Sequence, residues 1–419
     1  MARGTKLSAG ILASALFALL AFAPFASAAS DPVASGTTTV TLNKSFTKYL
    51  GTFGIKVSKV SPAKVKGSKA TFTVTGGTID PTTGLGEVTL GGGLKIKAGK
   101  KSTTIKALVL DTSKKALTGK IAGKKTKVAT IAGWSFARNG FGVNLTIKKL
   151  KLNGSAATAL NKKLGFAKGT PKPFIGGKLI GTGASETQPS TVTVKPGGLM
   201  TLAADATTFK KLSDVKVKIP VSAPTTEPSL GTFAFPIIGG TVGPTGTAGV
   251  VQSAGGLQLL QKLPTSATTF IETEINLGNV YADLAAKTLT VEVVAKSTAS
   301  PSLNLGNLGR SSIADITVPG VVADPATRTV TVTNAPATLQ VVSAEVLEGF
   351  VKVYQGYVEG GNTKAYCENP VASPGGCATA PELETAKAFG KVEGEKAVKD
   401  DHIAAGNPLG TVSFTAQGE

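Results

Sequence analysis

An internal repeat constrains the fold of this chain more than any other sequence feature. At a fixed offset of 163 residues, without gaps, Phe72 falls on Phe235 and Gly76-Gly77-Thr78 falls on Gly239-Gly240-Thr241. Agreement over a long span at one register is improbable by chance, so the sequence predicts two copies of one module. The same offset also aligns Phe46 with Phe209, Lys48 with Lys211, Pro81 with Pro244, and Gly92-Gly93-Leu94 with Gly255-Gly256-Leu257.

The repeated segment has the pattern of a β-hairpin. In "FTVTGGTIDPTTGLGEVTLGGGLKI", Val and Thr alternate on either side of an Asp-Pro-Thr-Thr-Gly turn. Abundant Gly, Thr and Val with few aromatic residues favour many short strands. We therefore predict a mainly β fold of tandem antiparallel β-sandwich-like domains with a few short helices. Helices are expected around Phe46, at 155–164 and after Pro381, and strands at 104–110, 119–121, 127–131, 142–151, 268–277, 288–294 and 327–332.

The distribution of charge indicates where one copy ends. From Ala29 to Ile180 there are 26 Lys and one Arg against four acids, whereas Gly181 to Glu419 has 16 bases against 21 acids. We predict a Lys-rich first domain at 29–180, a divergent second domain at 181–350, and a C-terminal extension at 351–419. The extension contains a cysteine loop and a charged helix.

The N-terminus predicts export. A basic start, an uncharged run and the sequence Ala26-Ser27-Ala28 describe a signal peptide at 1–28. No later stretch reaches the roughly 20 apolar residues of a spanning helix. We expect a secreted, extracellular or cell-envelope protein, in which the two cysteines, Cys367 and Cys377, form one disulfide.

The excess of lysine in the first domain predicts attraction to polyanions. Nearly all of its bases are Lys, without the Arg-rich or aromatic-interleaved pattern of nucleic-acid binding. A solvated lysine-covered face is the favoured interpretation, and nucleic acid is not an expected partner. Retention on anionic cell-wall polymers is an intermediate possibility.

The residue inventory argues against an enzyme. A single histidine, His402, excludes a Ser-His-Asp or Cys-His site in either copy, and it excludes an ordinary zinc site. Asp80 precedes Pro81 and is therefore predicted to be a turn residue. Pairing Asp80 with Glu87 as acid and base would require the hairpin to fold against its apparent register.

Three segments in order resemble the HtaA-like domain, a haem-binding surface domain of high-GC Gram-positive bacteria. They are "LNKSFTKYL", the hairpin quoted above, and "IKKLKLNGSAATALNKKLG". The resemblance covers most of the first copy, 37–180, and more loosely the second copy from 193 to 350. It implies a mainly antiparallel β fold that holds haem through an axial tyrosine in the first short helical segment.

Carried over by residue, the resemblance places Tyr49 at the haem iron. Phe46 and Lys48 are further candidate residues of the cofactor site. Lys48 and Lys44 are candidates to pair with a propionate or to lower the phenol pKa. The family's supporting histidine has no counterpart, because the first copy contains no histidine. In the second copy the residue 163 positions after Tyr49 is Leu212.

Two further interpretations stay open. Tyr49 could instead pack beside Phe46 and dock a helix on the sheet, as aromatic pairs three residues apart do. The chain could be a structural or adhesive surface protein that kept the β scaffold without haem. If haem binds, haem-carrier proteins are additional candidate partners.

Overall fold

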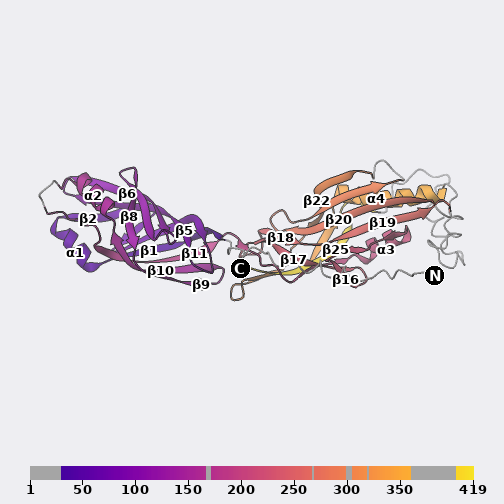
Figure 1. Cartoon of the computed structure of the whole chain (residues 1–419), viewed down its shortest axis with the longest axis horizontal. Helices are drawn as coiled ribbons and strands as arrows, with labels where there is room; N and C mark the ends of the chain where they lie inside the picture. Colours follow the sequence, from indigo (N-terminus) through magenta and orange to yellow (C-terminus); the bar gives the residue numbers. More distant parts are fainter. Residues whose placement is uncertain (1–29, 167–170, 267–268, 299–303, 319, 360–402) are drawn as a thin grey trace, which may run out of the picture.

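The computed structural model describes residues 30–166, 171–266, 269–298, 304–318, 320–359 and 403–419. Two β units lie end to end, and the C-terminus lies between them (Figure 1). All strand pairs within the described ranges are antiparallel, and the predicted mainly β tandem fold is confirmed. The signal peptide, the disulfide, the charged helix and His402 lie outside the described residues.

The first unit is an 11-stranded sheet that closes on itself. It closes because β4 pairs with β1 on one side and with β5 on the other. Two helices complete the unit: α1 (Lys44–Thr52) and α2 (Gly154–Leu164). The strands are β1 (Asp31–Leu42), β2 (Ile55–Val60), β3 (Lys64–Lys66), β4 (Lys69–Ile79), β5 (Gly86–Ala98), β6 (Lys101–Asp111), β7 (Ala116–Ile121), β8 (Lys124–Ile131), β9 (Trp134–Asn139), β10 (Gly142–Leu152) and β11 (Leu179–Pro189).

The second unit is a 14-stranded sheet that closes in the same way. Here β17 pairs with β13 and β18, and β18 pairs in turn with β20. Its helices are α3 (Ala206–Asp214) and α4 (Val341–Glu359). The strands are β12 (Val192–Thr193), β13 (Leu199–Ala204), β14 (Val217–Lys218), β15 (Val221–Ser222), β16 (Thr226–Ser229), β17 (Thr232–Val242), β18 (Gly249–Ser253), β19 (Gly256–Pro264), β20 (Phe270–Asp283), β21 (Thr288–Ser297), β22 (Gly306–Ile316), β23 (Val321–Asp324), β24 (Thr329–Leu339) and β25 (Pro408–Gln417).

The repeated hairpin explains why the two copies share sequence. Gly77 has φ 128° and Gly240 has φ 117°, and a Cβ at either position would lie 2.0 Å from a carbonyl oxygen of the paired strand. Only glycine is compatible with that approach. The aligned phenylalanines, Phe72 and Phe235, are almost fully buried, each in the core of its own unit.

The two sheets extend across the segment boundaries at 180/181 and 350/351. The change of charge at Gly181 falls inside β11, which pairs with β1 and β10, so the first sheet continues to Pro189. The strand β25, at residues predicted to form a C-terminal extension, lies between β13 and β24. Backbone hydrogen bonds on both sides therefore make the end of the chain part of the second sheet.

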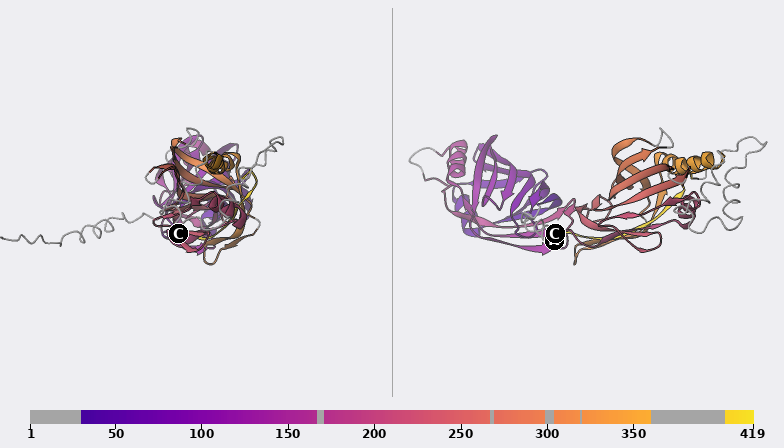
Figure 2. Two further views of the ribbon diagram at one scale, coloured as in Figure 1. Left: turned by 90° about the vertical axis from the view of Figure 1, so that its right-hand side faces the viewer. Right: turned by 45° about the vertical axis from the view of Figure 1, so that its right-hand side comes forward.

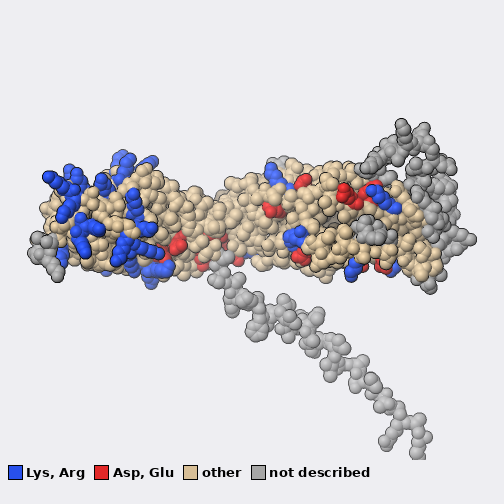
Figure 3. Space-filling model, turned by 90° about the horizontal axis from the view of Figure 1, so that it is seen from above, with Lys and Arg blue, Asp and Glu red and all other residues tan. Residues whose placement is uncertain are grey.

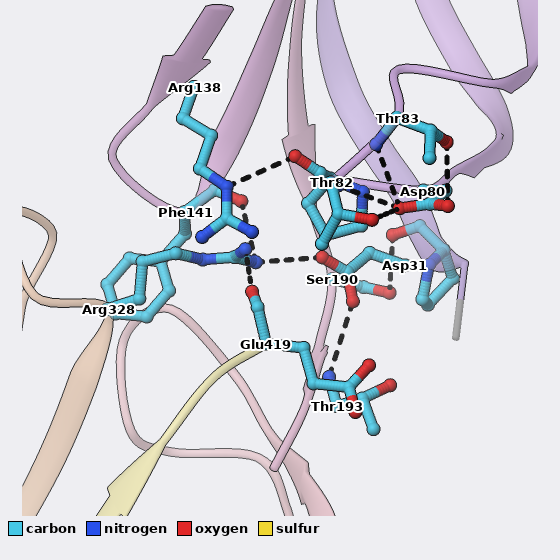
Figure 4. Close-up of polar contacts among 12 residues, drawn as sticks. Asp31, Asp80, Thr82, Thr83, Arg138, Phe141, Ser190, Thr193, Arg328 and Glu419 are labelled. Carbon is cyan, nitrogen blue, oxygen red and sulfur yellow. Dashed lines mark hydrogen bonds and ion pairs between the residues drawn. The ribbon is translucent and has the colours of Figure 1, made fainter. Parts of the chain in front are cut away.

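A buried ion pair joins the two units (Figure 4). Asp31, in β1, lies with its Oδ2 2.8 Å from Nη2 of Arg328, which directly precedes β24, and both side chains are buried. Arg328 also donates to the backbone carbonyls of Glu419 and Phe141. Burial raises the pKa of Asp31 against the attraction of Arg328.

Candidate functional site

The helix α1 carries the tyrosine that the sequence predicts as a haem ligand. The helix begins where Oδ1 of Asn43 accepts hydrogen bonds from the backbone N–H groups of Ser45 and Phe46, at 2.9 and 3.2 Å. Leu50 is buried and anchors the helix to the core of the first unit. Tyr49, the preceding residue, is 38% exposed.

Tyr49 lies at the edge of a small aromatic cluster formed with Phe53 and Phe166. The rings of Tyr49 and Phe53 meet edge to face with centroids 5.2 Å apart, and Phe53 and Phe166 do the same at 5.9 Å. The Tyr49 hydroxyl donates a 3.3 Å hydrogen bond to the carbonyl of Lys172. The cluster therefore joins α1 to the end of α2 and to the loop before β11.

The two other predicted site residues occupy different faces of α1. Phe46 is half-buried and packs against the core of the first unit. Lys48 is exposed, as is Lys44 one turn earlier. Phe46 thus supports the helix, and Lys48 contributes charge beside Tyr49.

Phe53, Phe166 and Lys172 are site residues that sequence reasoning missed. Phe53 follows Tyr49 by four residues, a helical spacing that signals contact on one face. Phe166 and Lys172 carry no comparable signal, because their proximity depends on how the chain after α2 returns to the sheet.

The unit that carries this site is rich in lysine. Figure 3 shows blue side chains gathered on the end of the first unit that lies away from the junction. In the described part of this unit, Lys114 forms an ion pair with Asp111 at 2.9 Å. The five acids of the unit are Asp31, Asp80, Glu87, Asp111 and Glu186, and none of them belongs to α1 or the aromatic cluster. The surface near Tyr49 is therefore strongly cationic.

The hairpin carboxylate Asp80 has a structural role. Its carboxylate accepts hydrogen bonds from the backbone N–H and hydroxyl groups of Thr82 and Thr83, at 2.6 to 3.2 Å (Figure 4). Burial acts to raise the pKa of Asp80, but these hydrogen bonds outweigh burial and lower it. A carboxyl group held ionised in a turn is unsuited to act as a general acid.

The second copy places a different residue at the position of Tyr49. The N-caps Asn43 and Asp205 and the buried leucines Leu50 and Leu212 are related by an offset of 162, not 163. Leu212 is therefore the counterpart of Leu50, and the prediction that it replaces Tyr49 is wrong by one residue. The counterpart of Tyr49 is Lys211, because the second copy has one extra residue between this helix and the hairpin.

The remaining described tyrosines of the second unit do not supply a comparable site. Tyr354 and Tyr357, both in α4, are buried, and the Tyr357 hydroxyl donates to the carbonyl of Pro264 at 2.6 Å. Tyr281 lies half-buried beneath Arg310, whose guanidinium carbon is 3.6 Å from the ring centre. Among the described residues, no group of three or more His, Cys, Asp or Glu side chains could hold a metal ion.

The tandem antiparallel units define a class of mainly β protein, and comparison with known proteins adds only a distant likeness. No protein-family model matches the chain, and no curated protein matches it. Two domains of HtaA from Corynebacterium glutamicum resemble it at 13% identity and a TM-score of 0.30. The C-terminal domain aligns over 98% of its own length with 38% of this chain. The N-terminal domain aligns over 98% of its own length with 54% of this chain.

The heme binding protein HtaB from the same organism resembles the chain at 12% identity and a TM-score of 0.29, with 55% of this chain and 96% of HtaB aligned. These values describe a fold-level likeness and carry no argument about the site. In the part of the chain that the structure describes, none of the helices has the length and apolar character needed to cross a membrane.

Proposed function

We propose that the first unit binds ferric haem through Tyr49 and that the chain acts as a secreted or cell-surface haem-binding protein in haem or iron acquisition. The observation that carries the proposal is the placement of the Tyr49 hydroxyl at an aromatic edge within a cationic surface. A phenolate is a known axial ligand of ferric haem, and the exposed ring leaves its oxygen within reach of one.

The residues around Tyr49 fit the chemistry of haem. Haem combines a flat apolar macrocycle with two propionates, and the site offers the Phe53 and Phe166 rings together with Lys48, Lys44 and Lys172. A free phenol has a pKa of about 10, so the charge of the bound iron would be needed to hold it in its ionised form at neutral pH. The hydrogen bond from Tyr49 to Lys172 is long, at 3.3 Å, and would be given up on binding.

Haemin titration of the mature protein tests the proposal. We expect the Soret band to shift with one equivalent of haemin, and Tyr49→Phe to abolish that shift while it retains the ring that packs against Phe53. Tyr281→Phe is the matched control, since it removes a phenol hydroxyl from the second unit. Unchanged one-equivalent binding by Tyr49→Phe would refute the ligand assignment, and no binding by the unaltered chain would favour a structural or adhesive role.

The charge of the first unit favours a second candidate function, retention on anionic envelope polymers. The excess of exposed lysines over carboxylates in this unit is the supporting observation (Figure 3). Such binding should fall steeply between low and moderate salt, because the screening length drops to about 8 Å at 0.15 M ionic strength. Salt-independent cell-wall association would argue against it.

A further inference from the structure

The second unit contains an apolar cavity beneath its two helices. The cavity has a volume of about 130 Å³ and is lined by α3, α4 and the strands β13, β17, β19, β20, β21, β22, β24 and β25. Both helices lie at the end of the second unit away from the junction (Figures 1 and 2). Phe233 and Ile275, deep in its wall, are almost fully buried, so the cavity reaches into the hydrophobic core.

The wall of this cavity is free of charge. Eighteen of its 22 residues are apolar, and the other four are Thr208, Ser311, Ser312 and Ser343. Two of those hydroxyls are already bonded to backbone carbonyls, that of Thr208 to Pro408 at 2.8 Å and that of Ser312 to Leu289 at 3.5 Å. The cavity therefore offers dispersion contacts and almost no polar recognition.

The mouth of the cavity is also apolar. Val342, at the start of α4, is 65% exposed, and Leu308, in β22, is 44% exposed, and both line the cavity. A buried apolar cavity of about 150 Å³ stays dry and binds small apolar molecules. Exposed apolar side chains at the opening extend the same surface outward, so an occupant can reach from the core to solvent.

We propose that this cavity binds the terminal segment of an alkyl chain, such as the acyl chain of a fatty acid or a lipid, while the rest of the chain lies against the apolar opening. Haem does not fit the wall, which has no iron ligand and no basic group for a propionate. A polypeptide does not fit the interior, because its backbone N–H and C=O groups would find no partners there. An alkyl chain has no polar group to satisfy, and its polar end can remain at the mouth.

A displacement assay on the full mature chain tests this inference. The probe is cis-parinaric acid, a fluorescent 18-carbon fatty acid, with 1-dodecanol, dodecanoate and vesicles of phosphatidylglycerol as competitors. We expect dodecanol and dodecanoate to displace the probe with similar affinities, because the cavity recognises the chain and not the head group. Displacement by vesicles in addition would identify a lipid as the source, and displacement by the free amphiphiles alone would identify a fatty acid.

Variants that fill the cavity locate the site. Val346→Trp places an indole from α4 in the cavity and should weaken probe binding about tenfold or more. Val322→Trp is the control, since Val322 is 64% exposed in β23 and does not line the cavity. Ile313→Trp, from the opposite wall, provides a second filled cavity, and thermal unfolding checks that each variant is folded. Equal probe binding by both filled variants and the control, or no binding by the unaltered chain, would overturn the inference.

Discussion

The two units carry the same strand arrangement and place a short capped helix at the same point in the chain, but the environment of that helix differs. In the first unit α1 presents Tyr49 and an aromatic cluster within a lysine-rich surface. In the second unit Phe209 and Leu212 of α3 line an uncharged apolar cavity. One scaffold therefore supports two chemically distinct surfaces, and each can change without altering the hairpin that closes the sheet.

The largest expected effects concern the cores that the two units share by repetition. Phe72→Ala and Phe235→Ala each remove a phenyl ring that is 0 to 1% exposed, and each should lower the free energy of unfolding by about 3–5 kcal/mol. Because the two rings belong to separate cores, each variant should shift one calorimetric transition. If either variant shifts both transitions equally, the units do not unfold separately. Val322→Ala is the exposed control.

The ion pair at the junction should matter somewhat less. Arg328→Met leaves the buried Asp31 carboxylate without its partner, and we expect a loss of about 3 kcal/mol in urea unfolding at neutral pH. Adding Asp31→Asn should recover part of that loss, since no charge then remains buried. Lys210→Met, which removes a surface pair with Asp214, is the control and should cost about 0.3–0.5 kcal/mol. An Arg328→Met loss as small as that of Lys210→Met would contradict this role.

Sequence predicted the repeated fold because its signals are local. The hairpin glycines must be glycine in both copies, and the alternation of Val and Thr marks strands on either side of them. The junction pair has no local signal, because Asp31 and Arg328 are separated by 297 positions. The pairing of β25 between β13 and β24 is equally long-range, so a strand at the end of the chain could not be assigned to a sheet.

The candidate site was predicted only in part, for a related reason. Tyr49 stood out by residue type, but its aromatic partner Phe166 and the carbonyl of Lys172 come from a segment more than 100 residues away. The register of the second copy was misassigned because an ungapped offset hides a single inserted residue. The N-caps of α1 and α3, Asn43 and Asp205, identify 162 as the correct offset for the helix.

Two tyrosine substitutions in α3 test that corrected register. Leu212→Tyr forces a larger polar side chain into the core and should lower stability by about 1–3 kcal/mol. Lys211→Tyr, at the half-buried counterpart of Tyr49, should change stability much less. Urea unfolding followed by circular dichroism measures both. If Leu212→Tyr cost no more than Lys211→Tyr, the offset of 163, which aligns Leu212 with exposed Tyr49, would describe the helix better than 162.

The smallest expected effect comes from the hairpin turn, where Asp80 in the first copy corresponds to Gly243 in the second. Asp80→Gly removes the hydrogen bonds to Thr82 and Thr83 and should lower the stability of the first unit by about 1 kcal/mol at pH 7. Because folding lowers the pKa of Asp80, its stabilising contribution is present above the unfolded pKa and is lost as pH falls through the folded pKa. The difference in unfolding free energy between the unaltered chain and Asp80→Gly should therefore close in acid. A difference that persists unchanged below the folded pKa would mean that glycine flexibility, and not the ionised carboxylate, distinguishes the two turns.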